Sequence, residues 1–158
     1  MGYTTYFDGR FNLNKAMDDD TYNLIKNLAR TRRMKRDVNK LEKLGCGKVE
    51  DFGEEGEFFV KNDGCFGQSK DESIIDYNTP PITQPGLWLQ WIPTEDRLGL
   101  KWDEGEKFYN SVEWIVYLIE KILEPKGYIV NGRVEAQGED PDDKYCITVT
   151  DNVVLVVD

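Results

Sequence analysis

Four carboxylates stand close together near the end of the chain, within the stretch GEDPDDK. They belong to Glu139, Asp140, Asp142 and Asp143. Oxygen ligands of this kind bind Ca²⁺ or Mg²⁺, and paired carboxylates act as general acid and base. The ligand order and the central glycine of an EF-hand are missing, so the plainer interpretation is an acidic turn in water. A carboxylate or metal-dependent enzyme around residues 139–143 remains an alternative.

The other reactive residue types exclude several kinds of enzyme. Histidine is absent, which removes Ser-His-Asp and Cys-His pairs and any zinc site built with imidazole. Cys46, Cys65 and Cys146 are odd in number and lack C-x-x-C spacing, which indicates a reducing compartment rather than a disulfide framework. A three-cysteine zinc site remains an alternative. No glycine-rich phosphate loop follows a predicted strand, so we expect a protein that is not an enzyme and uses no cofactor.

Charge is distributed unevenly along the chain, whose formal net charge is −10. Nine basic residues between 26 and 48, against Asp37 and Glu42, give that segment a charge of +7 and leave −17 for the remainder. An acidic body repels phosphate but suits a basic groove on another protein. The alternatives are a basic segment that is simply a solvated helix face and a nucleic-acid-binding module. The residues expected to contact nucleic acid in that module are Arg30, Arg32, Arg33, Lys35, Arg36, Lys40 and Lys43.

Two groups of residues are candidates for binding a partner protein. The first is an acidic face that combines the carboxylates of residues 139–143 with Glu54 and Glu55. The second lies in the stretch IDYNTPPITQPGLWLQWIPTED, where consecutive prolines prevent a helix and Pro-Gly predicts a turn. Loops held on a rigid scaffold often carry binding residues. We expect Trp88, Leu89 and Trp91 to point inward, with Ile74, Ile75 and Ile82 also buried, and Tyr77, Asn78, Thr79 and Gln84 to point outward.

Hydrophobic periodicity places the remaining elements. Apolar residues at helical spacing predict helices over 18–31, over 32–45 as a basic helix, and over 104–123, the last capped by Asp103 with Glu106. Strands are predicted within 3–14, 57–64, 86–93, 97–102 and 127–138, and a terminal hairpin over 145–158 that turns at Asp151-Asn152.

This order predicts an α+β fold, a mostly antiparallel sheet with helices on one face and a C-terminal hairpin. A ferredoxin-like core is compatible with it. We expect a single domain over 1–158, with 30–56 as an inserted basic helix and acidic loop. No run of eighteen apolar residues and no signal pattern is present, so we expect no membrane association and a cytoplasmic protein.

Three stretches, IDYNTPPITQPGLWLQWIPTED, WDEGEKFYNSVEWIVYLI and GYIVNGRVEAQGEDPDD, resemble a family of small uncharacterised proteins from bacteria, phages and mobile elements. The resemblance covers most of the chain from about Gly56 and the N-terminal YFDGRFNLNKAMDDDT. It implies no activity or site residues, but it favours a host-facing role. We therefore predict a small acidic protein that binds and inhibits a host protein with a basic surface. An anti-CRISPR or anti-restriction inhibitor that occupies a nucleic-acid groove is one such protein.

Overall fold

The main sheet has six antiparallel strands in the order β4-β5-β1-β6-β7-β8, which confirms the predicted α+β class. The structure is a computed structural model that describes residues 3–60 and 70–158. One half of the sheet consists of β4 (Trp91–Pro93) at the edge, then β5 (Gly99–Trp102), then β1 (Tyr6–Leu13). The other three are consecutive in the chain: β6 (Val130–Gln137), β7 (Lys144–Thr150) and β8 (Val153–Val157).

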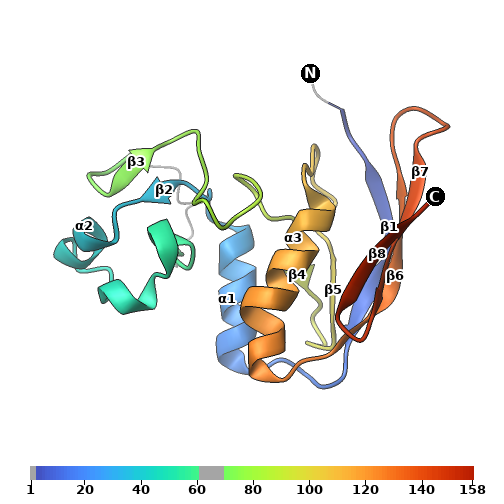
Figure 1. The fold of residues 1–158 in the computed structure, drawn as a ribbon, viewed down its shortest axis with the longest axis horizontal. Helices are drawn as coiled ribbons and strands as arrows, with labels where there is room; N and C mark the ends of the chain where they lie inside the picture. The colour runs from blue at the N-terminus through green and yellow to red at the C-terminus, as the bar shows by residue number, and fades with distance from the viewer. Residues whose placement is uncertain (1–2, 61–69) are drawn as a thin grey trace.

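Alternation along the strands decides which face of the sheet is covered. On β1, Phe7, Phe11 and Leu13 are buried, whereas Asp8 and Asn12 between them are exposed. The inward residues of β6 and β7 repeat this pattern and join one core. Helices α1 (Asp19–Ala29) and α3 (Ser111–Leu118) lie against the inward face, and the opposite face is open (Figure 1). This is the predicted arrangement of helices on one side of a sheet.

The first predicted helix is confirmed, with its predicted start. Asp18 caps α1, because its side chain accepts a hydrogen bond from the Thr21 backbone N–H at 2.7 Å. Ile25 and Leu28 provide the buried stripe. Asp19 and Asp20 occupy the first turn, where the helix dipole favours negative charge.

The second long helix begins seven residues later than predicted. Glu104, Lys107 and Asn110 have φ angles of 66°, 58° and 60°, which no right-handed helix contains. Residues 103–110 are therefore a loop that inserts Phe108 into an aromatic cluster with Phe7 and Trp91. After α3 the chain continues as a π turn (Ile119–Leu123) and a 3₁₀ turn (Glu124–Lys126), and Gly127 ends it at φ 83°.

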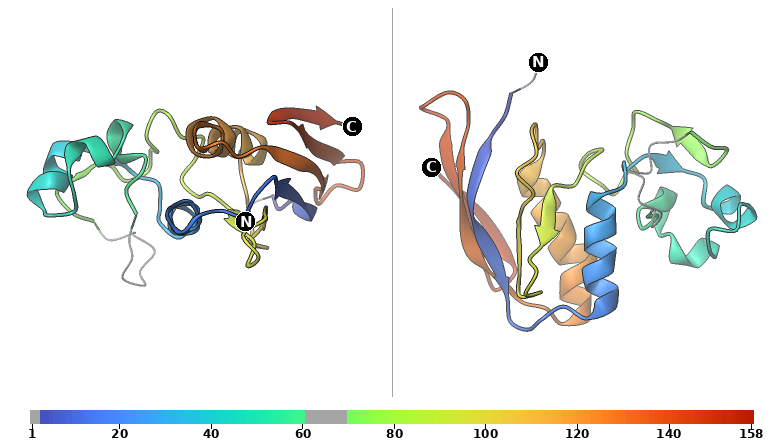
Figure 2. Two further views of the ribbon diagram at one scale, coloured as in Figure 1. Left: turned by 90° about the horizontal axis from the view of Figure 1, so that it is seen from below. Right: turned by 180° about the vertical axis from the view of Figure 1, so that it is seen from behind.

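Between α1 and β4 the chain builds a small lobe, defined here as the described residues within 34–82. It contains β2 (Lys35–Arg36), α2 (Val38–Lys43), two 3₁₀ turns (Val49–Asp51 and Glu54–Gly56) and β3 (Ile74–Asp76). Its own cluster of buried residues is Leu41, Phe52 and Phe59. Figures 1 and 2 show that α1 and α3 lie between this lobe and the sheet.

Three sequence predictions between residues 32 and 93 are wrong. The basic helix predicted over 32–45 is only six residues long, because Lys35 and Arg36 pair with β3 and Asp37 caps α2 directly after them. Residues 57–60 of the predicted strand 57–64 are not a strand, and 61–64 lie outside the described residues. The predicted strand 86–93 is reduced to Trp91–Pro93. The ferredoxin-like core stays a prediction. When the small lobe is left out, the elements from β1 to β6 follow the order strand–helix–strand–strand–helix–strand, which is consistent with it.

Candidate functional site

The acidic stretch 139–143 forms the turn between β6 and β7, and part of it has a structural role. Tyr3 donates its hydroxyl to Asp143 Oδ2 at 2.7 Å, and the Thr4 backbone N–H donates to Glu139 Oε1 at 3.0 Å. These two carboxylates therefore hold the N-terminal segment. The side chains of Asp140 and Asp142 are exposed at the tip of the turn.

Glu54 and Glu55 lie on the small lobe, at the other end of the molecule from the β6–β7 turn (Figure 1). Glu55 Oε1 accepts the Ile82 backbone N–H at 2.7 Å, and its Oε2 pairs with Lys35 Nζ at 3.0 Å. The hydrogen bond from Ile82, and then the pairing with Lys35, lower the pKa of Glu55. The structure therefore does not bring the predicted acidic residues together into one face.

The basic segment is also not the continuous contact surface that the sequence predicted. Arg33 and Arg36 are each 1% exposed, so neither can reach a phosphate. Arg36 donates to Asp71 Oδ2 at 3.1 Å and stacks on Phe59, with its guanidinium carbon 4.1 Å from the ring centroid. Lys35 is paired with Glu55, as described above. Arg30, Lys40 and Lys43 remain exposed.

Arg33 instead joins the small lobe to the loop before β4. Its guanidinium donates to Gln84 Oε1 at 3.2 Å and to the carbonyls of Phe59 (2.6 Å), Glu57 (2.9 Å) and Gly56 (3.2 Å). Burial lowers the pKa of Arg33 to about 9, because removal from water disfavours the charged form. Charge in a buried position is tolerated here because four acceptors surround it.

Gln84 and Tyr117 complete the network and connect it to α3. Gln84 Nε2 donates to the Glu57 carbonyl at 2.7 Å and to the Tyr117 hydroxyl at 3.1 Å, and this hydroxyl donates to Glu57 Oε1 at 2.8 Å. Burial raises the pKa of Tyr117. Gln84 is 5% exposed, so its predicted outward position on a binding loop is wrong. Its local sequence, flanked by Thr and Pro, gave no sign of this role.

The remaining predicted loop residues lie beside Arg32. The Arg32 guanidinium carbon is 4.3 Å from the Tyr77 ring centroid, and its Nη2 donates to Asn78 Oδ1 at 3.3 Å. Asn78 and Thr79 are exposed, and Asp76 fixes both through hydrogen bonds of 2.9 and 2.8 Å. Asn78 and Thr79 therefore point outward, as predicted, whereas Tyr77 is only partly exposed and its ring stacks against Arg32.

Two nearby apolar predictions are corrected. Ile75 and Ile82 are 58% and 77% exposed, although the sequence analysis placed them in the core. Trp91 and Leu89 are fully buried, as expected, and Trp88 is partly buried. Ile75 is exposed because β3, among the described residues, pairs with β2 alone, in a two-stranded sheet at the periphery.

The stretch from 78 to 88 borders a hollow of about 540 Å³ opposite the loop before α3. The side chains that line it include Arg32, Asn78, Pro80, Trp88, Lys107 and Tyr109. Polar and aromatic residues from distant parts of the sequence thus meet at one place. No pair of them forms the combination of nucleophile and base that covalent catalysis needs.

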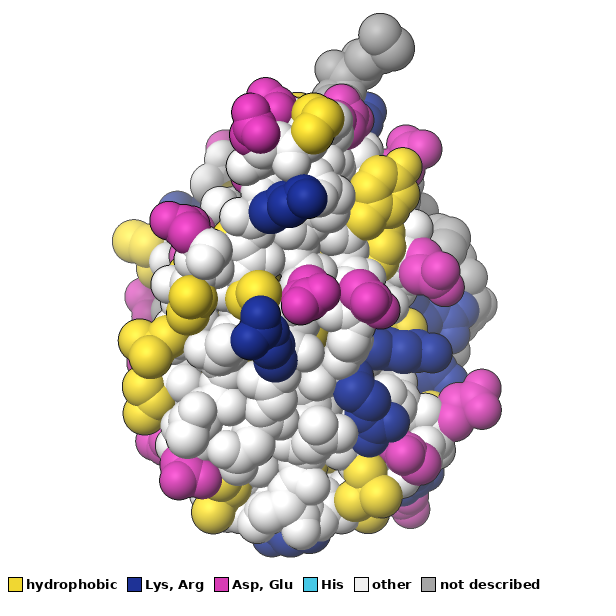
Figure 3. Space-filling view, turned by 90° about the vertical axis from the view of Figure 1, so that its right-hand side faces the viewer, with side chains coloured by type: hydrophobic (Ala, Val, Ile, Leu, Met, Phe, Trp, Pro, Cys, Tyr) yellow, Lys and Arg dark blue, Asp and Glu magenta, His cyan; other side chains and the backbone are white. Residues whose placement is uncertain are grey.

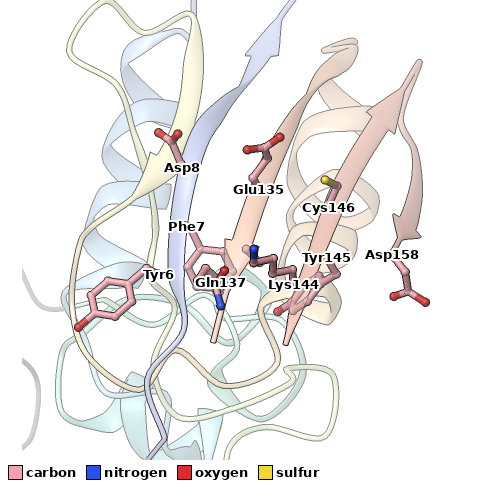
Figure 4. A pocket seen from close by; sticks show the side chains of 10 residues that line it. Tyr6, Phe7, Asp8, Glu135, Gln137, Lys144, Tyr145, Cys146 and Asp158 are labelled. Atoms are coloured by element: carbon pink, nitrogen blue, oxygen red, sulfur yellow. The ribbon is translucent and has the colours of Figure 1, made fainter. Parts of the chain in front are cut away.

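A second hollow of about 430 Å³ lies on the C-terminal part of the sheet and includes residues of its open face (Figure 4). Asp8, Glu135 and Cys146 form one row across β1, β6 and β7, since they are direct partners in the strand register. Arg133 Nη2 contacts Cys146 Sγ at 3.0 Å and Glu135 Oε1 at 3.5 Å. Cys46 and Cys146 are free thiols, and Cys65 lies outside the described residues.

Within residues 3–60 and 70–158, no group of three or more Cys, Asp or Glu side chains is arranged to hold a metal ion. The same part of the chain contains no helix with the length and apolar composition needed to span a bilayer.

Exposed apolar residues gather on the outer edge of β8, a feature that the sequence did not predict. Val153, Leu155, Val156 and Val157 are 50–61% exposed. Figure 3 shows apolar side chains gathered along one margin of the open face of the sheet. The alternation of apolar residues predicted the hairpin, but it could not show that β8 is the last strand of the sheet.

Comparisons with protein-family models, with curated proteins and with solved structures found no match to this chain. The resemblance to a phage and mobile-element family therefore stays a prediction.

Proposed function

We propose that the protein acts by binding a host protein with a basic surface and inhibiting it, without a catalytic step. The observation that carries this proposal is the internal position of Arg33 and Arg36. The buried charged residues among those described are these two arginines and Glu57, which together carry +1. The whole chain has a formal net charge of −10, so the residues other than these three carry −11. Because Arg33 and Arg36 are buried, segment 26–48 contributes less positive charge to the surface than its sequence suggests.

Electrostatic complementarity is what such a surface contributes to binding. It speeds association with an oppositely charged partner and disfavours partners of the same charge. Nucleic acid is a partner of the same charge, and two of the seven arginines and lysines expected to bind it are internal. We therefore favour a protein target over a nucleic acid. A CRISPR or restriction nuclease, whose groove must attract phosphate, is the specific target that we propose.

Capture of targets from a host lysate at increasing salt tests this function. We expect retention of a specific host protein to fall by about tenfold between roughly 50 and 500 mM NaCl, because salt screens exposed charges. A double variant, Asp140→Asn with Asp142→Asn, should weaken capture, since both carboxylates are exposed at the β6–β7 turn. Glu95→Gln with Glu120→Gln removes the same charge from exposed positions elsewhere and is the matched control. Capture that is indifferent to salt would reject the electrostatic basis of the proposal.

Inhibition is measured separately, with the captured protein once it is identified. If the captured protein is a nuclease, the purified protein should reduce cleavage and compete with its nucleic-acid substrate. Binding without any effect on the target's activity would leave an adaptor role and reject inhibition.

A further inference from the structure

The two edges of the six-stranded sheet are very different. β4 is three residues long, contains Pro93, and packs against α1, so it offers little backbone to another strand. β8 has five residues, Val-Val-Leu-Val-Val, and contains no proline or charge. Among the described residues, β8 has only β7 as a strand neighbour. An exposed apolar edge strand of this kind can receive an additional strand from another protein.

Side chains on both faces of β8 support the addition of a strand. Val153, Leu155 and Val157 lie on the open face, across from Thr150, Thr148 and Cys146 of β7. Val156, on the helix side, is also half exposed. A strand placed next to β8 would therefore cover apolar surface on both sides while it completes the backbone hydrogen bonds.

Acidic groups surround the Val157 end of this strand. On the helix side, a hollow of about 700 Å³ is bordered by Glu113, Asp142, Asp143 and Asp158. On the other side, the hollow of about 430 Å³ described above is bordered by Asp8, Glu135 and again Asp158. Lys144 is the basic residue at both hollows. Partner residues that continue past β8 would meet carboxylates on either side, which favours lysine or arginine there.

We propose that the β8 edge receives an extended segment of the partner protein, with alternating apolar residues followed by lysine or arginine. This inference rests on the proposed function and specifies where the partner binds. A second copy of this chain fits less well. Antiparallel pairing of two β8 strands about Leu155 would place Asp158 of one copy opposite Asn152 and next to Asp151 of the other. It would also bring together two bodies that each carry −10.

Synthetic peptides test the chemistry of the partner directly. The probe has five alternating valine and threonine residues with two lysines at each end. One comparison peptide carries glutamates in place of the lysines, and another carries proline at its central positions. Binding is measured by fluorescence polarisation at low salt, and the site is located by amide hydrogen exchange of the full-length protein.

We expect the lysine peptide to slow exchange of the amides of residues 153–157. The glutamate peptide should bind at least about tenfold more weakly, since its charges repel the acidic hollows. The proline peptide should give no protection, because it lacks the N–H groups that a sheet needs. Protection elsewhere but not in β8, or equal binding of the lysine and glutamate peptides, would overturn the inference.

Leu155→Lys is the informative variant of the protein, with Leu98→Lys as its matched control. Both leucines are exposed, 61% and 40%, so neither change is expected to unfold the chain. Leu155→Lys should reduce binding of the lysine peptide about tenfold or more, because it adds a like charge and removes apolar contact, whereas Leu98→Lys should leave binding unchanged. Equal loss in both variants, or in neither, would contradict a site at β8.

The same pair of variants separates this inference from the proposed function. If lysate capture of a host protein is sensitive to salt but unchanged in Leu155→Lys, the function stands and the β8 site is wrong. If the lysine peptide binds at β8 but no host protein is captured, the site stands and the function is wrong. Sedimentation velocity that shows a dimer, lost in Leu155→Lys, would identify a second copy as the occupant and reject the basic partner segment.

Discussion

At the scale of single residues, the sequence segment richest in positive charge supplies two internal guanidinium groups. Arg33 shows this best, because its guanidinium donates to the carbonyls of Gly56, Glu57 and Phe59 and to Gln84 Oε1. Arg33 thus joins the small lobe to the loop before β4, beside the apolar contacts that Phe58 and Val60 make with the larger core. Like a small hydrophobic core, Arg33 holds segments together, but it does so through buried hydrogen bonds. Water can replace these hydrogen bonds only when the small lobe opens.

Arg33→Met should therefore destabilise the protein strongly. The side chain keeps similar length, but Gln84 Oε1 and the Phe59 carbonyl lose the donor that Arg33 provides in a buried place, and the Glu57 and Gly56 carbonyls lose one of their two donors. We expect a loss of about 3 kcal/mol or more in the free energy of unfolding, measured with urea. Arg30→Met, at an exposed position of the same segment, is the control and should change stability by less than about 0.5 kcal/mol. Similar losses in both variants would show that the buried network contributes little.

A second residue-scale prediction concerns Asp96, in the turn between β4 and β5. Hydrogen bonds from the Thr94 hydroxyl and the Leu98 backbone N–H, with Arg10 nearby, lower the pKa of Asp96 to about 2. A carboxylate whose pKa is lower in the folded state stabilises the fold above its unfolded pKa of about 3.9. This contribution is lost as the pH falls through about 2.

The measurement compares the wild-type protein with Asp96→Asn from neutral to acid pH at constant ionic strength. We expect the wild type to be the more stable protein near neutral pH. The difference should begin to shrink below about pH 4 and be largely gone near pH 2. A difference that is the same at every pH would mean that the charge of Asp96 does not contribute.

At the scale of elements, local signals predicted α1 and the C-terminal hairpin because their stabilising contacts are local. The cap by Asp18 and the apolar spacing of Ile25 and Leu28 lie within one helix. The start of α3 is different. Its preceding loop is held by contacts with distant residues: Trp91 Nε1 donates to the Ser111 carbonyl, and Asn110 Nδ2 donates to the Pro85 carbonyl. The sequence of residues 103–110 alone therefore could not show that they form a loop and that the helix begins at Ser111.

The same distinction applies to the candidate site. The exposed turn at 139–143 followed from its composition, whereas the burial of Gln84 depends on Tyr117 and Glu57, which lie far away in sequence. The exposed edge of β8 depends on the order of strands in the finished sheet. Sequence analysis therefore identified polar turns correctly and missed the features that arise from packing between elements.

The turn between β7 and β8 allows an element-scale test with two glycine variants. Asp151 and Asn152 both have positive φ, 46° and 71°, so glycine fits either position. Asn152 also connects the hairpin to the body, because its Oδ1 accepts the Val130 N–H at 2.7 Å and its Nδ2 donates to the Tyr128 carbonyl at 3.1 Å. Asn152→Gly should lose about 1–2 kcal/mol, whereas Asp151→Gly should be close to neutral. Urea unfolding measures both, and equal effects would assign the role of Asn152 to backbone conformation alone.

At the scale of the whole molecule, two cores of unequal size are connected by the polar network of Arg33 and by Phe58 and Val60 of the small lobe, which pack against the larger core. The larger core lies between the sheet and the helices, and the smaller one, around Phe52 and Phe59, lies inside the small lobe. Regions with few buried apolar contacts open at lower free energy than the global unfolding transition. The small lobe should therefore exchange its amide hydrogens faster than β1 and β6 under native conditions, and hydrogen-exchange mass spectrometry measures this difference. Equal rates in both regions would indicate a single cooperative unit.

Net charge is the other property that belongs to the whole molecule. At −10 the folded chain repels itself, and the five ion pairs among the described residues are mostly exposed, so each contributes little. Salt should screen the repulsion more than it weakens these pairs. We expect the melting temperature to rise by about 2–4 °C between roughly 10 and 300 mM NaCl, which corresponds to about 1 kcal/mol in a chain of this length.

Differential scanning calorimetry measures this shift, and a less acidic variant provides the control. Glu95→Gln with Glu120→Gln removes two negative charges from exposed positions and should reduce the response to salt. A melting temperature that falls as salt increases would show that attraction within pairs such as Arg97–Asp19 outweighs the general repulsion. In that case the acidic surface would be locally neutralised, and the electrostatic basis for binding a basic partner would be lost together with it.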